Sequence, residues 1–337
     1  MLITYLRSSS LSNYDFCEQQ YYLNYTLGYE RSAGIKAEKG SILHKVMECL
    51  ALLKLDFQSH DNPQLEIEEV ACGKLSVPRE SLMSISVAEG ILNKVFEYYS
   101  GKSIYGYTKK DFKDIAGWMY TVLSYGKGVF DPRNRKVQDV EKRFDITVDK
   151  AWAKYIYDGV EGQLAIKGTI DFITKIDNNT IEIIDWKTGK RYDWAAGEEK
   201  TYEKLCKDQQ LMLYYWAAKK LYPEVENIIV TIYFIADGGP FTIAFDAEHI
   251  KKTEENLQKA FVRIRNNNMP KMVSYTQSSF KCTKLCDYFK NAHPDSKDGT
   301  NTCKFIHNEL KRIGMEATTK KYSVKGHNVS NYQCPGE

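Results

Sequence analysis

The sequence predicts an α/β (α+β) protein in which helices flank a mixed sheet and a helical insertion precedes that sheet. Two observations predict this class. Apolar residues recur at helical spacing in residues 80–131, 202–221 and 247–266. Residues 140–187 are instead rich in Ile, Val, Thr and aromatic side chains, which is typical of strands. At 337 residues, the chain is long enough for one elaborated domain or two.

Composition and charge limit the class of protein. Hydrophobic residues make up 43% and charged residues 27%, as expected for a folded globular chain. The net charge of +3 excludes a polybasic protein, so any nucleic-acid site must be local. No apolar run approaches the roughly 18 residues of a membrane helix, and the first residues do not resemble a signal peptide. We therefore expect a cytoplasmic protein of a bacterial or phage-infected cell, without membrane contact.

The N-terminal part is expected to be helical. Residues 10–31 predict one helix that carries Cys17. A second helix is expected to begin with Ser41 as its cap, which places His44 one turn inside it. Residues 56–78 are polar and predict a loop, and residues 80–131 predict two or three further helices.

The strands come next. The segments VEKRFDITV, LAIKGTIDFITKI and TIEIIDWKT predict an antiparallel meander. A helix over residues 202–221 is stopped by Pro223, and two more strands, NIIVTIYFIA and PFTIAF, precede a helix over 247–266. The tail from Lys271 has few apolar residues, so we expect it to depend on a bound metal or on docking. These changes in sequence pattern divide the chain into an N-terminal helical region (1–135), a core (136–270) and a cysteine-containing tail (271–337).

Two carboxylates and a lysine lie within segments that are otherwise predicted to be buried strands. Asp185 and Lys187 are two residues apart, so a strand points both to one face, opposite Trp186. A three-residue loop over 177–179 places Asp171 directly across from Asp185, whereas a two-residue turn places it across from Trp186. We predict the three-residue loop. Carboxylates grouped in this way suit Mg²⁺ or Mn²⁺ and metal-assisted phosphodiester hydrolysis; a plain Asp185–Lys187 ion pair is the structural alternative.

These residues occur within a longer pattern. GSILHKVME, GTIDF, IIDWKTGK and DQQLMLYYWAA follow one another along the chain. In this order they resemble the RecB-like branch of the PD-(D/E)xK nucleases, in which an upstream His, an Asp after a Gly-led strand, a D/E-x-K strand and a Q-x3-Y helix occur. The resemblance implies the PD-(D/E)xK core fold and covers roughly residues 10–265, although residues 50–135 match only as helices.

The resemblance also implies roles for individual residues. His44, Asp171, Asp185 and the main-chain carbonyl of Trp186 would bind the metal, and Lys187 would be the catalytic lysine. Two further residues carry the helix motif and would belong to the catalytic set, namely Gln210 and Tyr214. They lie one helical turn apart, so both can face the sheet. Glu141 also lies near this centre, but no role is assigned to it.

Four cysteines flank the nuclease-like segment. In several RecB-like nucleases, among them AddB-type and CRISPR-associated members, one cysteine before the core and three after it hold a 4Fe-4S cluster. The resemblance assigns that role here to Cys17, Cys282, Cys286 and Cys303. The sixteen residues between the last two depart from the usual close spacing. Zn²⁺ bound by Cys282, Cys286, Cys303 and His307 is the alternative, and free thiols are a third.

The leading functional hypothesis is a metal-dependent deoxyribonuclease. It would act as an exonuclease on single-stranded DNA or DNA ends in recombination, repair or phage DNA metabolism. The chain has no G-x4-G-K-[ST] motif for ATP, so unwinding would need a helicase or recombination partner. One alternative is a CRISPR-associated nuclease that trims prespacers. Another is a DNA-binding subunit of nuclease fold whose chemistry is dispensable.

Overall fold

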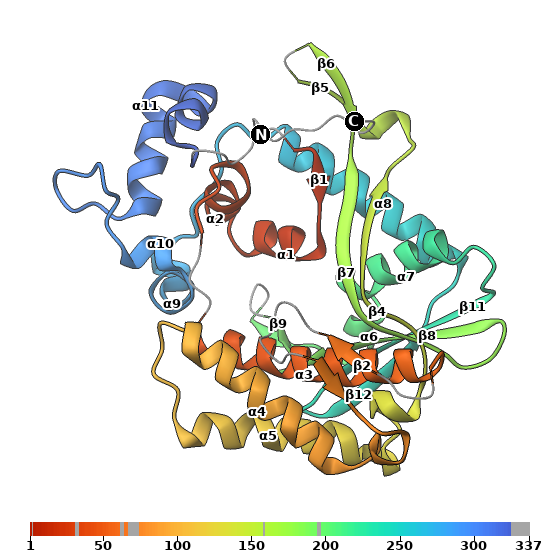
Figure 1. The fold of residues 1–337 in the computed structure, drawn as a ribbon. Helices are drawn as coiled ribbons and strands as arrows, with labels where there is room; N and C mark the ends of the chain where they lie inside the picture. Colours follow the sequence, from red (N-terminus) through yellow and green to blue (C-terminus); the bar gives the residue numbers. More distant parts are fainter. Residues whose placement is uncertain are drawn as a thin grey trace.

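A computed structural model describes residues 1, 3–30, 34–60, 64–66, 74–157, 159–193 and 197–324. The expected loop over 56–78 lies partly outside these residues. The predicted fold class is confirmed, because a mixed sheet lies between two sets of helices (Figure 1). None of the described helices is long and apolar enough to cross a membrane.

The central sheet has the strand order β4-β7-β8-β11-β12, with β1 beside the start of β7. Its strands are β1 (Tyr5–Leu6), β4 (Lys136–Thr147), β7 (Ala165–Lys175), β8 (Thr180–Lys187), β11 (Asn227–Phe234) and β12 (Gly239–Ala244). The predicted meander is confirmed, since β4, β7 and β8 pair antiparallel in chain order. The pairs β8–β11 and β1–β7 are parallel, and this makes the sheet mixed.

In the described part of the chain, three short hairpins lie outside this sheet. They are β2 (Gln64–Glu66) with β3 (Lys74–Ser76), β5 (Lys154–Tyr157) with β6 (Val160–Gln163), and β9 (Tyr192–Asp193) with β10 (Glu198–Glu199). The β5–β6 hairpin projects from the end of the long β4 and β7 strands (Figure 1).

The described helices fall into a group before the meander and a group after it. The N-terminal helices are α1 (Ser8–Phe16), α2 (Glu18–Tyr21), the π-helical turn Tyr22–Thr26, α3 (Ile35–Phe57), α4 (Ile85–Lys102) and α5 (Lys109–Ser124). The helices after the meander are α6 (Tyr202–Leu205), α7 (Gln209–Leu221), α8 (Ala247–Arg265), α9 (Tyr275–Leu285), α10 (Asp287–Lys290) and α11 (Thr302–Tyr322). Short 3-10 turns occur at Arg79–Ser81, Tyr125–Lys127, Pro132–Asn134 and Ala151–Ala153.

Alternate residues of the strands supply two hydrophobic cores, one on each face of the sheet. Phe172, Ile184 and Trp186 join the core formed with α3, α4 and α5. Ile173 and Ile183, their neighbours in sequence, join the core formed with α7 and α8. This alternation follows from the two-residue period of a strand, and it buries the sheet on both faces. The helical insertion α4–α5 is therefore part of the core over one face.

The first helices pack with the last helix rather than with the insertion. Residues of α1, α2 and α11 belong to the same core as α7 and α8. Tyr22 and Thr319 are joined by a side-chain hydrogen bond of 2.9 Å, and the amide of Val324 donates to the carbonyl of Leu27 at 2.8 Å. These two hydrogen bonds join the N-terminal and C-terminal parts of the described chain.

The expectation of one helix over residues 10–31 is wrong. The chain is extended at Cys17, with φ −166° and ψ 114°, so α1 ends there and α2 begins. Apolar periodicity continues across this break, which is why the sequence did not reveal it. Beside the break, the amide of Gln19 donates to the carbonyl of Lys271 at 3.1 Å. The interruption therefore lies where the first helices meet the start of the C-terminal tail.

Candidate active site and cysteine cluster

The two aspartates lie where β7 and β8 part. These strands pair from Lys175–Ile181 to Phe172–Ile184, whereas β8 stays paired with β11 as far as Lys187. Continuing the register places Asp171 across from Asp185, immediately beyond the last pair. The predicted three-residue loop is confirmed, since the amide of Ile176 donates to the carbonyl of Thr180 at 2.9 Å and 177–179 lie between them. The fork opens a gap in the sheet between the two carboxylates.

Helix α3 brings His44 to this fork. Its Nδ1 lies 3.2 Å from Oδ2 of Asp171. The helix can approach closely because residue 40 is glycine: a Cβ there would lie 2.9 Å from Oγ1 of Thr188, just after β8. Burial acts to lower the pKa of His44, but the Asp171 carboxylate outweighs it and the net pKa is raised. For Asp171, burial acts to raise the pKa, but His44 outweighs it and the net pKa is lowered.

The expected start of this helix is wrong. The helix begins at Ile35 and not after Ser41, whose hydroxyl donates to the carbonyl of Ala37 within the helix. Serine and glycine together look like a helix start, but here both lie in the interior. His44 therefore lies well inside α3, with helical turns before and after it that fix the position of its backbone.

Asp185 is the most buried of the site carboxylates, with its side chain 1% exposed. The ammonium of Lys187 lies 2.7 Å from Oδ2 and 3.0 Å from Oδ1. Burial raises the pKa of Asp185 to about 6. The pKa of Lys187, which burial acts to lower, is raised by Asp185 and then by Asp171. The predicted pairing of Asp185 and Lys187 on one face is thus present, with Trp186 in the opposite core.

Helix α7 adds the next contact to Asp185. Nε2 of Gln210 donates to Oδ1 of Asp185 at 3.2 Å and to the hydroxyl of Tyr214 at 2.7 Å. The expected helix over 202–221 is in fact two, α6 and α7, because Asp208 caps a new start: its Oδ1 accepts from the amides of Gln210 and Leu211. This cap fixes Gln210 in the first turn of α7, where it can reach the fork.

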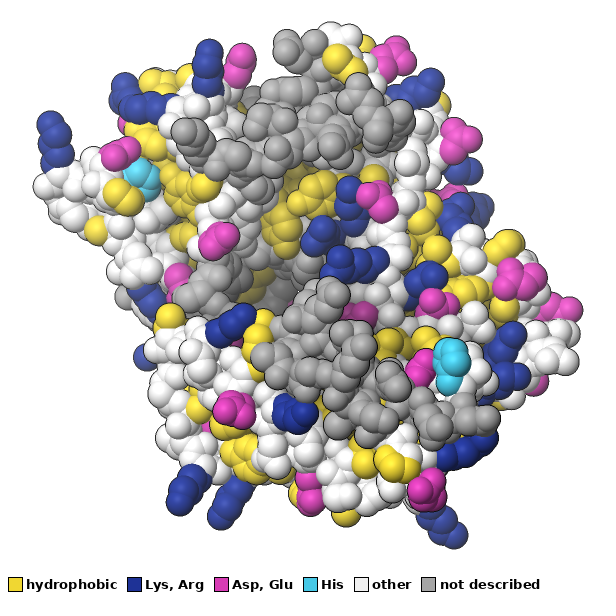
Figure 2. Space-filling view, in the orientation of Figure 1, with side chains coloured by type: hydrophobic (Ala, Val, Ile, Leu, Met, Phe, Trp, Pro, Cys, Tyr) yellow, Lys and Arg dark blue, Asp and Glu magenta, His cyan; other side chains and the backbone are white. Residues whose placement is uncertain are grey.

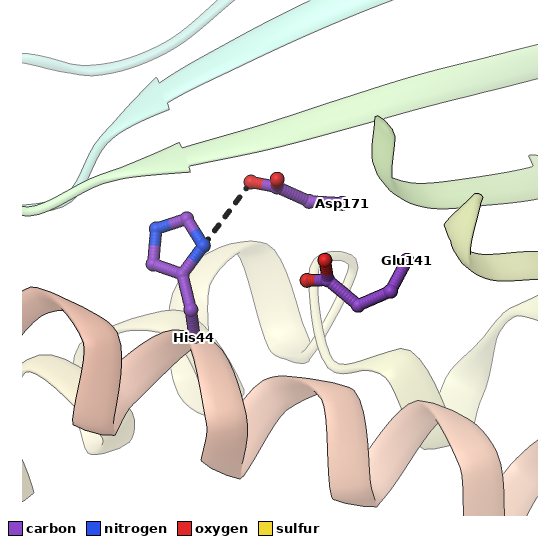
Figure 3. Close-up of side chains that lie close together, drawn as sticks. All are labelled: His44, Glu141 and Asp171. Atoms are coloured by element: carbon purple, nitrogen blue, oxygen red, sulfur yellow. Dashed lines mark ion pairs between the residues drawn. The ribbon is translucent and has the colours of Figure 1, made fainter. Parts of the chain in front are cut away.

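Glu141 lies near the centre, as expected, although the sequence assigned it no role. It lies on β4, where Val140 pairs with Phe172 and Lys142 with Ile170, so Glu141 is across from Asp171. Ligand atoms of His44, Glu141 and Asp171 all lie within 4.8 Å of one another, and the three side chains converge in Figure 3. Burial, and then Asp171, raises the pKa of Glu141 to about 7.

The β4–β7 register is the signal that could have shown Glu141 to lie across from Asp171. It is hidden because the register shifts at a bulge between Val137 and Asp139. A bulge adds a residue to one strand, so counting back from Asp171 along the sequence does not give its partner. Glu141 also has φ 46°, in the left-handed region that a strand residue seldom adopts.

A pocket of about 460 Å³ contains this group. It is lined by part of α3, including His44, Lys45 and Glu48, by Tyr99 of α4, and by the residues at the fork. The insertion α4 therefore supplies part of the wall. In Figure 2, Lys and Arg side chains gather beside a hollow near the middle of the face, where they could attract a phosphate backbone.

The four flanking cysteines come together although almost 290 residues separate the first from the last. Cys17 lies between α1 and α2, Cys282 in α9, Cys286 between α9 and α10, and Cys303 in α11. Each thiol interacts electrostatically with the other three. Burial is the main cause that raises the pKa of Cys17, Cys282 and Cys303.

Their spacing differs from that of the carboxylate site. Among the described residues, only His44, Glu141 and Asp171 place three ligand atoms within 4.8 Å. Four sulfurs on one Zn²⁺, each about 2.3 Å from it, would have to meet that limit. His307, the fourth ligand of the zinc alternative, instead has Nδ1 3.4 Å from Oε1 of Gln19. The sulfurs are thus neighbours without being arranged around a single ion.

A comparison with models of protein families agrees with this fold. The family model described as the PD-(D/E)XK nuclease superfamily matches residues 8–290. The chain belongs to the PD-(D/E)XK nuclease superfamily. Members of this superfamily are metal-dependent nucleases, and Asp171 with Asp185-x-Lys187 has the order of the superfamily's name. The expected nuclease core is therefore confirmed, whereas the iron-sulfur branch within the superfamily stays a prediction.

Two solved structures match much of the chain at low sequence identity. A protein from Eubacterium rectale named "Putative exonuclease" is 11% identical, with a TM-score of 0.47, and the match covers 85% of this chain and 87% of that one. SSO0001 is 18% identical with a TM-score of 0.25, and the match covers 74% and 95% of the two chains. No curated protein matches the chain.

Proposed function

We propose that this protein is a divalent-metal-dependent deoxyribonuclease that acts as an exonuclease on single-stranded DNA or DNA ends. One observation carries the proposal: His44, Asp171, Asp185 and Lys187, drawn from α3, β7 and β8, meet at the fork of the sheet. Imidazole and carboxylate ligands beside a lysine suit a Mg²⁺ or Mn²⁺ ion that acts on a phosphodiester.

The fork has room and donors for such an ion. Oδ2 of Asp171 is buried without a well-aligned hydrogen bond among the described residues, and His44 is its close neighbour. In the proposed mechanism with DNA bound, His44, Asp171, Asp185 and the Trp186 carbonyl would hold the ion, which would activate a water and stabilise charge on the phosphate. Lys187 holds its proton beside Asp185 and offers positive charge to the scissile phosphate.

Gln210 acts through Asp185. Its amide fixes Oδ1 of that carboxylate, and its second contact to Tyr214 fixes the amide itself. Such second contacts hold a ligand in the orientation that the metal requires. In the proposed site, Gln210 and Tyr214 are therefore positioning residues that keep Asp185 directed towards the fork.

We further propose that Cys17, Cys282, Cys286 and Cys303 hold a 4Fe-4S cluster. Four thiols that interact pairwise, drawn from the first and last helices, support this assignment. Their lack of single-ion spacing favours a cluster over Zn²⁺. The cluster would join the chain ends that the Tyr22–Thr319 contact already brings together.

The test is cleavage by anaerobically purified protein of single- and double-stranded DNA labelled at the 5′ or 3′ end, with Mg²⁺ or Mn²⁺. We expect stepwise shortening from an end and no cleavage of circular single strands. Asp185→Asn should abolish cleavage while DNA binding persists. Asp145→Asn is the matched control, since Asp145 is exposed on β4 and pairs with Lys167 outside the pocket. Wild-type protein that binds DNA but cleaves none with either ion would instead support a binding subunit.

A further inference from the structure

Glu141 differs from the other carboxylates of the pocket in having no partner. Glu48 lies 2.6 Å from the ammonium of Lys45, and Asp185 is paired with Lys187. Among the described residues, the carboxylate of Glu141 makes neither an ion pair nor a hydrogen bond. It is nevertheless only partly exposed and lies close to Asp171. Two neighbouring carboxylates beside a single imidazole leave this group with uncompensated negative charge.

The space between these groups is the size of a cation site. Donors at opposite corners of an octahedral ion, each about 2.1 Å from it, are roughly 4.2 Å apart. Ligand atoms of His44, Glu141 and Asp171 lie within 4.8 Å of one another, so small rotations of their side chains would close them on one ion. Figure 3 shows the three arriving from separate elements, with the imidazole and both carboxylates directed to a common point.

Asp185 does not belong to this group. With His44 and Asp171 it forms no set of three ligand atoms within the same limit. Its two oxygens are taken up by Lys187 and Gln210 instead. In the DNA-free protein, the side chains spaced most like the ligands of a cation are therefore His44, Glu141 and Asp171. This group does not include Asp185 of the D-x-K motif.

We propose that Glu141 is a metal ligand, and that His44, Asp171 and Glu141 hold a divalent cation in the DNA-free protein, at a position to which Asp185 does not contribute. This inference rests on the proposed nuclease function and adds a ligand that the motifs do not supply. Asp185 would join these ligands only when DNA is bound.

The experiment measures Mn²⁺ binding by calorimetry without DNA, so its readout is independent of cleavage. Glu141→Gln removes the charge and keeps the shape. Glu48→Gln is the matched control, because it removes a charge of the same kind from the wall of the same pocket. Asp185→Asn tests the motif carboxylate. We expect Glu141→Gln to weaken Mn²⁺ binding about tenfold or more, and the other two variants to weaken it by less than about threefold.

Each outcome decides the inference. If Asp185→Asn abolishes Mn²⁺ binding while Glu141→Gln binds as the wild type does, the cation sits on the motif carboxylates and Glu141 is not a ligand. If Glu48→Gln weakens binding as much as Glu141→Gln, the effect is general charge and the inference also fails. Glu141→Asp keeps the charge and should therefore bind Mn²⁺ more tightly than Glu141→Gln. This comparison separates loss of the carboxylate from poor folding of the Gln variant. Failure of the nuclease proposal would appear separately, as wild-type protein that cleaves no DNA.

Discussion

Glu141 combines two unusual properties in one residue, an unpaired carboxylate and a left-handed backbone. Its φ of 46° places it where L-residues other than Asn and Asp are seldom found. Strained backbone of this kind tends to occur where a side chain must be directed to a site. The strand would be more stable with a residue that tolerates this conformation, which gives a test of the strain.

At position 141 we predict that glycine is more stable than alanine. Both substitutions remove the carboxylate, but only glycine adopts φ 46° without a steric penalty of roughly 1 kcal/mol. Urea unfolding of Glu141→Gly and Glu141→Ala measures the difference in free energy of unfolding. The same pair at Lys142, on the same strand but without a positive φ, is the control, and there alanine should be the more stable by about 0.5 to 1 kcal/mol. Equal stability of the two Glu141 variants would contradict the strain.

Gln210 carries a second prediction at the same scale. Gln210→Ala removes the hydrogen bond to Oδ1 of Asp185 and the link to Tyr214. We expect kcat on single-stranded DNA to fall about 10- to 100-fold with little change in KM, since the residue acts through Asp185. Tyr214→Phe keeps the ring and loses only the accepting hydroxyl, so its loss should be smaller. A change confined to KM would assign Gln210 to DNA binding instead.

Among the elements, the position of α3 against the end of β8 sets the distance from His44 to the fork. Gly40→Ala would place a methyl group 2.9 Å from Oγ1 of Thr188. We expect a loss of about 1 to 3 kcal/mol in the free energy of unfolding, and a fall in cleavage rate as His44 moves away from Asp171. Gly90→Ala in α4 is the matched control: nothing lies within 4 Å of its added Cβ, and it should gain up to about 1 kcal/mol. Full activity of Gly40→Ala would contradict this prediction, because it would show that α3 can move away from Thr188 without displacing His44 from Asp171.

How much could be predicted from the sequence also differs between elements. The register of β7 and β8 follows from the Asp177–Asn179 loop because strand alternation has a fixed period of two, so the meeting of Asp171 and Asp185 was predictable. The break at Cys17 was not, because apolar spacing continues through it. The start of α3 was not either, because Gly40 and Ser41 look like a helix start but lie in the helix interior. Glu141 was hidden for a third reason, since a bulge shifts β4 against β7.

For the whole molecule, the proposed cluster predicts a link between metal content and stability. Cys17→Ser should abolish the broad visible absorption and the iron content of about four per chain, and should lower the thermal midpoint, because a long loop is no longer closed. Cys49→Ser is the control: this thiol is buried in the core with α3, α4 and α5, away from the four cysteines. One zinc per chain without colour would assign the tail to Zn²⁺ instead.

The packing of the first helices against the last also affects how the protein is made. The partners in the Tyr22–Thr319 hydrogen bond are 297 residues apart, so one is synthesised long before the other. At about 5 to 20 residues per second, the ribosome needs roughly 15 to 60 seconds to cover that distance. Throughout this interval α1 and α2 lack α11, one of the surfaces against which they pack. Their tyrosine-rich side therefore remains accessible to chaperones. The final fold can therefore form only after α11 has been synthesised, however early the individual helices appear.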